Sequence, residues 1–142
     1  MTSPKLRASD SATTLIQSYY AAFNRDDGEA MLALLAPDVV HDLNEGGRET
    51  GVEAFRVFMA RMRRCYAEQL SNIRIIASPD GLHAAAEYVV SGKYLNDDVG
   101  LPPATGQSYS LSGGAFFDIA EGRITRVSNF YNLNEWIAQV SR

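Results

Sequence analysis

The stretch SGGAFFDIAEGRITRVSNFY, residues Ser112–Tyr131, decides the fold. Two β-rich runs, Ala115–Ile119 and Ile124–Tyr131, flank residues 120–123 (AEGR), which carry the only glycine between them. Aromatic and β-branched residues favour a pleated, half-buried surface, and a short glycine-containing break between two such runs is typical of a β-hairpin. Side-chain alternation places three residues on one face of the second strand: Val127, Asn129 and Tyr131.

An asparagine and a tyrosine beside apolar residues on one strand face indicate the lining of a pocket. The alternative is a sheet edge whose polar side chains are solvated. Both interpretations stay open at the level of the hairpin alone, so the rest of the chain has to supply the context.

Composition limits the classes of protein to consider. The chain has 142 residues and a mass of 15.6 kDa, which is enough for one domain with a real core. Its net charge of −4 is the opposite of the positive charge that favours binding to nucleic acid or acidic membranes. No apolar run approaches the roughly 20 residues of a membrane span, and the single cysteine, Cys65, allows no internal disulfide. We therefore expect a cytoplasmic protein that binds neither nucleic acid nor membranes.

Helical periodicity dominates the first half of the sequence. Residues 1–10 are polar and predict a flexible tail. Apolar residues at helical spacing then predict helices over Ser11–Asn24, Glu29–Leu35 and Val52–Tyr66. A short strand, Asp38–Leu43, is expected between the second and third helices.

The second half of the chain changes to the two-residue period of strands. Two strands, Ile73–Ala77 and His83–Leu95, precede a proline-bearing loop, and Tyr109–Ile119 leads into the hairpin described above. A last helical turn is expected over Asn132–Val140. Helices followed by strands indicate an α+β fold with an antiparallel sheet, formed by residues 11–142 as one domain. Long curved strands can wrap around a helix and leave a cone-shaped cavity.

Several segments resemble the nuclear transport factor 2-like superfamily: Tyr19–Asn24 (YYAAFN), Leu34–Val39 (LLAPDV) and Gly51–Phe58 (GVEAFRVF). Others are similar to its SnoaL-like polyketide cyclase and ketosteroid isomerase-related branch: Gly92, Gly100–Gly106 (GLPPATG), Gly113–Phe117 and Gly122–Ile124. The resemblance implies a curved antiparallel sheet around three helices, a deep apolar pocket and a homodimer packed through the outer face of the sheet. This scaffold hosts isomerases, cyclases, dehydratases, epoxide hydrolases and non-catalytic binding modules, so the resemblance leaves the function open.

Ketosteroid isomerase provides a pattern that can be compared residue by residue. It uses an aspartate base and an oxyanion hole made by a tyrosine and a protonated aspartate. The tyrosine falls on Tyr19. The aspartate base corresponds to Leu43 in this sequence. The neighbouring Asp42 points to the opposite face of the strand, so it can replace the base only if a β-bulge shifts the strand by one residue. The second acid falls near Gly114, where no acid occurs, so the complete isomerase set is absent.

The remaining candidates suit proton transfer. His41 shares the strand face of Leu43, and an imidazole with a pKa near 6.5 is a natural general acid or base at neutral pH. Tyr19 and Tyr131 can donate hydrogen bonds to a developing enolate oxygen, and Asn129 can orient a carbonyl or a water. Asp42 is the alternative base. Further residues are expected to contact a substrate: Glu45, Arg48, Glu87, Phe116 and Trp136.

Two classes of function remain. The first is a cofactor-free isomerase, cyclase or dehydratase acting next to a carbonyl of a hydrophobic small molecule. The second is a non-catalytic protein that binds a small ligand or serves as a dimeric scaffold. We expect no cofactor and no metal, because the glycine pairs match no phosphate-binding fingerprint and the histidines and carboxylates lack a metal-ligand spacing. The homodimer is expected to form through the strands Ala84–Tyr94 and Tyr109–Ile119.

Overall fold

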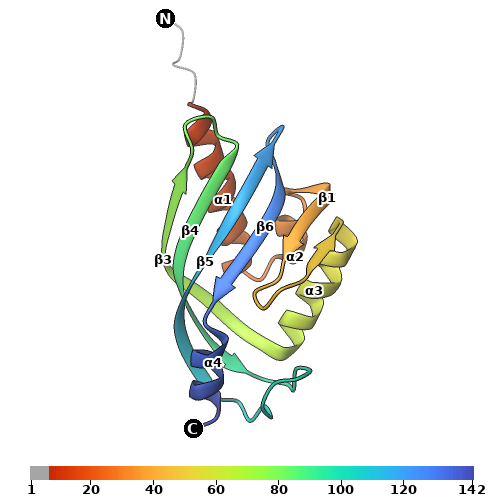
Figure 1. Cartoon of the computed structure of the whole chain (residues 1–142), viewed down its shortest axis with the longest axis vertical. Coiled ribbons are helices and arrows are strands. Elements are labelled where there is room, and N and C mark those ends of the chain that lie inside the picture. Colours follow the sequence, from red (N-terminus) through yellow and green to blue (C-terminus); the bar gives the residue numbers. More distant parts are fainter. Residues whose placement is uncertain (1–6) are drawn as a thin grey trace, which may run out of the picture.

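A computed structural model describes residues 7–142 of the chain (Figure 1). The helices and strands follow in the order α1 (Ala8–Asn24), α2 (Gly28–Leu32), β1 (Leu35–Asp42), β2 (Arg48–Thr50), α3 (Val52–Cys65), β3 (Tyr66–Ala77), β4 (His83–Tyr94), β5 (Ser108–Ala120), β6 (Arg123–Tyr131) and α4 (Leu133–Val140). The expected α+β class is therefore confirmed. None of the helices in the described range combines the length and the apolar character needed to cross a membrane.

The first helix begins earlier than the sequence predicted. Residues 1–6 of the expected tail lie outside the described residues, but Ala8 already belongs to α1. The amides of Asp10 and Ser11 donate to the carbonyl of Arg7, which closes the first turn without a side-chain cap. The tail assigned to residues 1–10 is thus too long at its C-terminal end.

The six strands form one curved sheet in the order β2-β1-β6-β5-β4-β3. All neighbouring strands are antiparallel except β1 and β6, which run parallel with His41 opposite Val127. The sheet is therefore mixed: the expected antiparallel pairing is found at every pair of neighbouring strands except this one. The reason is topological: everything from β2 to β5 lies between the two strands in sequence, so β6 returns beside β1 by a long crossover and not by a hairpin.

The third strand also begins earlier than expected. β3 starts at Tyr66, directly after α3, whereas the sequence pattern suggested a strand from Ile73. The pairing of β3 with β4 is irregular at Asn72, where φ is 51° and the register shifts between Ser71 and Arg74. A bulge of this kind interrupts the two-residue period and bends the strand. It divides β3 into two parts, and the sequence prediction covered only the second of them.

The helices pack on the concave face of the sheet. Figure 1 shows α1 behind the strands, α3 beside β1 and β2, and α4 at the end of β6. The core lies between these layers, and its most deeply buried residues include Ile16 of α1, Val39 of β1 and Phe117 of β5. Adjacent residues of β5 show the two faces: the side chain of Phe117 is 1% exposed, whereas that of Phe116 is 51% exposed.

Candidate functional site

His41 lies on the concave face of the sheet and is covered by α3. Its ring centroid is 4.5 Å from that of Phe55 and 4.6 Å from that of Phe58, and the residue is 1% exposed. Its Nε2 lies 3.1 Å from Nδ2 of Asn129 on the neighbouring strand β6. The pairing of β1 with β6 is regular from Val40 to Asp42, so alternation turns His41 inward, as the sequence pattern predicted.

The hydrogen bond from Asn129 fixes the state of the imidazole. Because the amide Nδ2 donates to Nε2 of His41, the ring proton resides on Nδ1. Nδ1 is buried and has no hydrogen-bond partner within residues 7–142. Burial lowers the pKa of His41, against smaller opposing effects of Glu49 and Asp42, so the ring is neutral at pH 7. A buried polar atom without a partner costs about 1–3 kcal/mol, which makes this atom a candidate for contact with a ligand.

Tyrosines line much of the concave face of the sheet. Three of the seven tyrosine hydroxyls donate to partners: Tyr66 to Asp98 at 2.7 Å, Tyr94 to the carbonyl of Pro102 at 2.7 Å, and Tyr109 to Glu68 at 2.6 Å. The other four make no hydroxyl hydrogen bond with any described residue: Tyr19, Tyr20, Tyr88 and Tyr131. The concave face therefore offers unused phenol donors.

The two tyrosines that the sequence singled out occupy different depths. Tyr19 is buried against Phe117, with their ring centroids 5.7 Å apart, and burial raises the pKa of its hydroxyl. Tyr131, two residues beyond Asn129 on the same strand face, is 42% exposed. Burial and the nearby carboxylates of Glu68 and Glu45 raise the pKa of Tyr131. Both side chains are thus neutral donors at pH 7, one deep in the core and one at the rim.

Glu68 is a functional candidate that the sequence interpretation missed. It lies on the concave face of β3, between Tyr66 and Leu70, and its Oε2 accepts the hydrogen bond of Tyr109. Burial raises the pKa of Glu68, and the hydrogen bond from Tyr109 opposes this shift. The alternation from Tyr66 to Leu70 was available as a signal, but the helix predicted up to Tyr66 and the bulge at Asn72 concealed the strand.

Comparison with known proteins gives the family. Residues 16–127 match the SnoaL-like domain. The chain belongs to the SnoaL-like family. A candidate polyketide cyclase from Xanthomonas campestris pv. campestris is 57% identical, with 94% of this chain and 98% of that chain covered and a TM-score of 0.91. A second, from Pseudomonas putida KT2440, is 51% identical over 96% of this chain and 99% of that chain, with a TM-score of 0.89.

More distant solved structures share only the fold. An epoxide hydrolase of the LEH-like type from M. tuberculosis has a TM-score of 0.77 at 16% identity, with 97% of this chain and 90% of that chain covered. No curated protein matches the sequence. The cone-shaped fold of the nuclear transport factor 2-like superfamily is therefore established for this SnoaL-like domain, whereas its chemistry has to be argued from the site.

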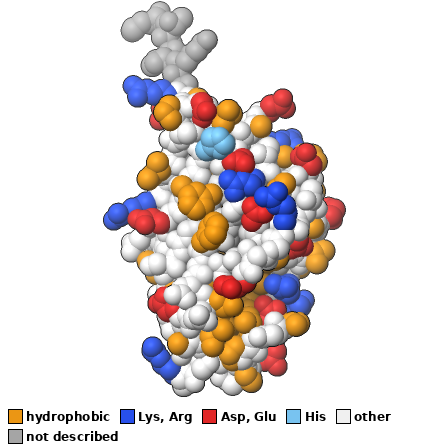
Figure 2. Space-filling model, in the orientation of Figure 1, with side chains coloured by type: hydrophobic (Ala, Val, Ile, Leu, Met, Phe, Trp, Pro, Cys, Tyr) orange, Lys and Arg blue, Asp and Glu red, His pale blue; other side chains and the backbone are white. Residues whose placement is uncertain are grey.

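Several residues expected in the site of the SnoaL-like domain lie on the convex face of its sheet. Glu87 is exposed and its carboxylate lies 3.5 Å from a guanidinium nitrogen of Arg74. Phe116 packs against Phe130, with ring centroids 5.7 Å apart. Figure 2 shows hydrophobic side chains in the middle of this face, with charged side chains beside them. The expected contact of Glu87 and Phe116 with a ligand in the cone is wrong, because alternation points both side chains away from it.

Asp42 and Arg48 also belong to the convex face. Arg48 Nε donates to Asp42 Oδ1 at 2.7 Å, and the hydroxyl of Ser128 donates to Asp42 Oδ2 at 2.6 Å. These two hydrogen bonds lower the pKa of Asp42 to about 2. A carboxylate this acidic is a weak base at neutral pH, and it faces away from His41. Asp42 is thus excluded as the alternative base, and Arg48 forms this ion pair on the convex face and does not point into the cone, where a substrate contact was expected.

Trp136 and Glu45 are the two remaining residues that were expected to contact a substrate. Trp136 is a buried residue of α4, with its ring 4.9 Å from that of Tyr94 and 5.7 Å from that of Tyr109. It packs behind the tyrosines and does not line a pocket. Glu45 is exposed in the loop after β1, where it accepts a hydrogen bond from Asn44. Its effect on the pKa of Tyr131 places it near the rim of the cone, so its contact with a substrate stays a prediction.

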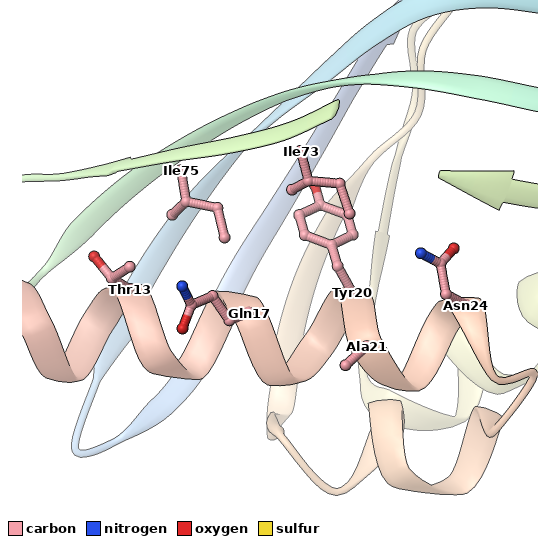
Figure 3. Close-up of a pocket in the computed structure, with 7 residues that line it drawn as sticks. All are labelled: Thr13, Gln17, Tyr20, Ala21, Asn24, Ile73 and Ile75. Atoms are coloured by element: carbon pink, nitrogen blue, oxygen red, sulfur yellow. The ribbon is translucent and has the colours of Figure 1, made fainter. Parts of the chain in front are cut away.

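Two cavities are defined by their linings, and neither includes a residue expected in the site. The larger, of about 290 Å³, lies between α1 and β3 and is lined by Thr13, Gln17, Tyr20, Ala21, Asn24, Ile73 and Ile75 (Figure 3). The smaller, of about 220 Å³, lies beside the start of α1. Around His41 the space is filled by Phe55 and Phe58, so the deep pocket expected there is closed by aromatic side chains.

Proposed function

We propose that this SnoaL-like domain is a cofactor-free enzyme that transfers a proton next to a carbonyl group of a hydrophobic small molecule. The observation that carries the proposal is the buried imidazole of His41, which Asn129 holds at Nε2 and which has no partner at Nδ1 among the described residues. The polyketide cyclase assignment of relatives at 57% and 51% identity supports a carbonyl compound as the substrate.

The proposed chemistry uses both nitrogen atoms of the His41 ring and both orientations of the Asn129 amide. With Asn129 Nδ2 on Nε2, the Nδ1–H group donates to a ligand oxygen. A half-turn of the amide presents Oδ1 to Nε2 and favours the other neutral tautomer. Solvent water takes the proton from Nδ1 and gives one to Nε2, so that Nε2–H donates to Oδ1 and Nδ1 carries a lone pair. Nδ1 then takes a proton from the carbon next to the carbonyl. The C–H bond breaks, its electron pair forms the C=C bond of the enolate, and the carbonyl π pair moves to the oxygen.

Phenol donors on the concave face stabilise the enolate in this proposal. Tyr19 and Tyr131 are neutral, because the pKa of each hydroxyl is raised, and neither hydroxyl is used by another described residue. Preorganised donors of this type are among the largest contributions to catalysis of enolate formation. Access requires the ring of Phe58 to move. Phe58 is half-buried, and Cζ of the Arg61 guanidinium lies 5.6 Å from the centroid of its ring.

Hydrogen–deuterium exchange of α-tetralone tests the proposal without knowledge of the natural substrate. α-Tetralone is a hydrophobic bicyclic ketone, and loss of its C2 protons in D2O can be followed by ¹H NMR. We expect the protein to accelerate the exchange above the buffer rate. A rate equal to that of buffer, together with binding of α-tetralone, would favour the second class of function, a non-catalytic ligand-binding protein.

Tyr19→Phe is expected to slow this exchange by about 10²–10³-fold, as removal of one oxyanion donor does elsewhere. The ring that packs against Phe117 is kept, so the fold should be unchanged. Tyr94→Phe is the control, since its hydroxyl already donates to Pro102 and is proposed to play no part in the site. Equal exchange rates for the Tyr19 variant and the wild type would remove Tyr19 from the mechanism.

The convex face is proposed to form a homodimer. It exposes Phe116 at 51%, Phe130 at 53% and Ile76 at 74%. Apolar patches of this kind mark interaction surfaces on folded proteins. We expect sedimentation at micromolar concentration to give twice the mass of the 15.6 kDa chain and Phe116→Asp to give the single-chain mass. A wild-type protein that sediments as one chain across this range would contradict the proposal.

A further inference from the structure

The geometry points to Glu68 and Tyr109 as a second oxygen-binding site on the concave face, distinct from the His41–Asn129 pair. Its ligand is an uncharged hydrophobic compound that carries a phenol, an alcohol or a carbonyl oxygen. The inference rests on the proposed ligand site of the concave face but not on catalysis, so it holds equally for an enzyme and for a binding protein.

Three neighbouring strands bring the pair together. Glu68 of β3 lies opposite Gly92 of β4, and Gly92 lies opposite Tyr109 of β5. The Tyr109 hydroxyl donates to Glu68 Oε2 at 2.6 Å. No hydrogen bond to Glu68 Oε1 is formed by any residue of the range 7–142. One carboxyl oxygen is thus held by Tyr109, and the other is free for a ligand.

Gly92 provides the space in which these two groups meet. A Cβ atom at this position would lie 2.7 Å from the Tyr109 hydroxyl and 2.9 Å from Cγ of Glu68. Its φ is not in the left-handed region, so backbone conformation does not require a glycine here. The requirement is steric: any side chain at residue 92 would push the carboxyl group and the phenol apart.

The surroundings of Glu68 are aromatic and hydrogen-bonding. Burial, and after it the carboxyl group of Glu68, raises the pKa of Tyr131 and raises that of Tyr88 to about 12. Neither hydroxyl is used by another described residue. Trp136 packs behind Tyr109. The ionisable groups coupled to Glu68 are therefore phenols that are neutral at pH 7.

The chemistry of the Glu68–Tyr109 pair determines which class of ligand can bind. Burial raises the pKa of Glu68, which favours the neutral carboxylic acid over the carboxylate. A neutral acid donates its O–H to a ligand oxygen, while its carbonyl oxygen accepts from Tyr109 or from a ligand hydroxyl. A ligand with its own carboxylate would be repelled once Glu68 ionises. The site thus suits a phenol, an alcohol or a ketone.

Binding of 2-naphthol, with naphthalene as the matched compound without oxygen, tests the site. The readout is the ¹³C carboxyl signal of Glu68, assigned by its absence in Glu68→Gln. We expect this signal to titrate above the ordinary glutamate pKa and to shift with 2-naphthol but not with naphthalene. Tyr109→Phe, which removes a hydrogen bond that lowers the pKa, should move the titration to higher pH.

Affinity provides the second measurement. We expect Glu68→Leu to weaken 2-naphthol binding about threefold to tenfold, the usual effect of one hydrogen bond, and naphthalene binding to stay the same. Glu87→Gln on the convex face is the control and should have no effect. A Glu68 signal that ignores 2-naphthol, or equal affinities in all three proteins, would overturn the inference. Failure of the α-tetralone exchange with this binding intact would reject only the proposed catalysis.

Discussion

His41→Gln is expected to slow the exchange of α-tetralone by about 10²–10⁴-fold, the usual contribution of a positioned general acid or base. Glutamine keeps a polar group of similar length beside Asn129 but has no nitrogen that can take and return a proton at neutral pH. The change should therefore leave packing against Phe55 and Phe58 largely intact. A variant that folds and binds α-tetralone but no longer exchanges its protons is the expected result.

The second histidine of the chain is the matched control. His83 is exposed on the convex face, where its Nδ1 lies 2.9 Å from a carboxylate oxygen of Asp118. We expect His83→Gln to exchange α-tetralone at the wild-type rate. If both histidine variants lose activity equally, or if neither does, His41 is not the proton-carrying group.

The pH dependence of the same reaction follows from the burial of His41. Burial lowers its pKa in the folded protein below the ordinary 6.5, so the ring stays neutral at pH 7 and somewhat below it. Exchange should therefore be constant near pH 7 and fall only as the pH drops through this lowered value. Since the folded state disfavours the charged ring, the wild type should also lose stability relative to His41→Gln as the pH falls below about 6.5.

Phe117→Ala is expected to reduce the free energy of unfolding by about 3–5 kcal/mol, the usual cost of removing a phenyl ring from a core. Phe117 is 1% exposed, and its ring lies 5.7 Å from that of Tyr19 and 6.0 Å from that of Tyr20. The cavity left by the ring would border both tyrosines. Urea denaturation measures the effect as a lower midpoint at unchanged slope.

Phe116→Ala is the control for this prediction, because it is the neighbouring residue on the opposite face of β5. At 51% exposure its ring buries less surface within one chain, so the loss should be well under half of that for Phe117→Ala. The comparison is made at low protein concentration, where an interface between copies contributes least. Similar losses for the two variants would mean that the faces of β5 are assigned incorrectly.

Alternation along single strands was the most reliable part of the sequence interpretation. It placed His41 and Asn129 on the inward faces of β1 and β6, and the structure brings their side chains together at 3.1 Å. The same rule already separated Asp42 from His41. Local alternation needs no knowledge of the partner strand, and this explains its success at these positions.

Features that depend on distant parts of the chain could not be predicted in the same way. The parallel pairing of β1 with β6 joins residues more than 80 positions apart, such as Asp42 and Ser128. The inward orientation of Glu68 depends on a strand that a bulge at Asn72 interrupts. Arg48 and Glu87 were expected to contact a substrate, and strand alternation sent both side chains to the convex face.

The most direct test of the account is the ¹⁵N spectrum of the His41 ring with and without α-tetralone. The pair with Asn129 predicts a neutral ring whose Nδ1 carries the proton in the free protein. We expect the Nδ1 signal to shift with α-tetralone and to stay in place with tetralin, the matched hydrocarbon without the carbonyl. An Nδ1 signal that responds equally to both compounds, or to neither at saturating concentration, would contradict the assignment of His41 as the group that meets the substrate oxygen.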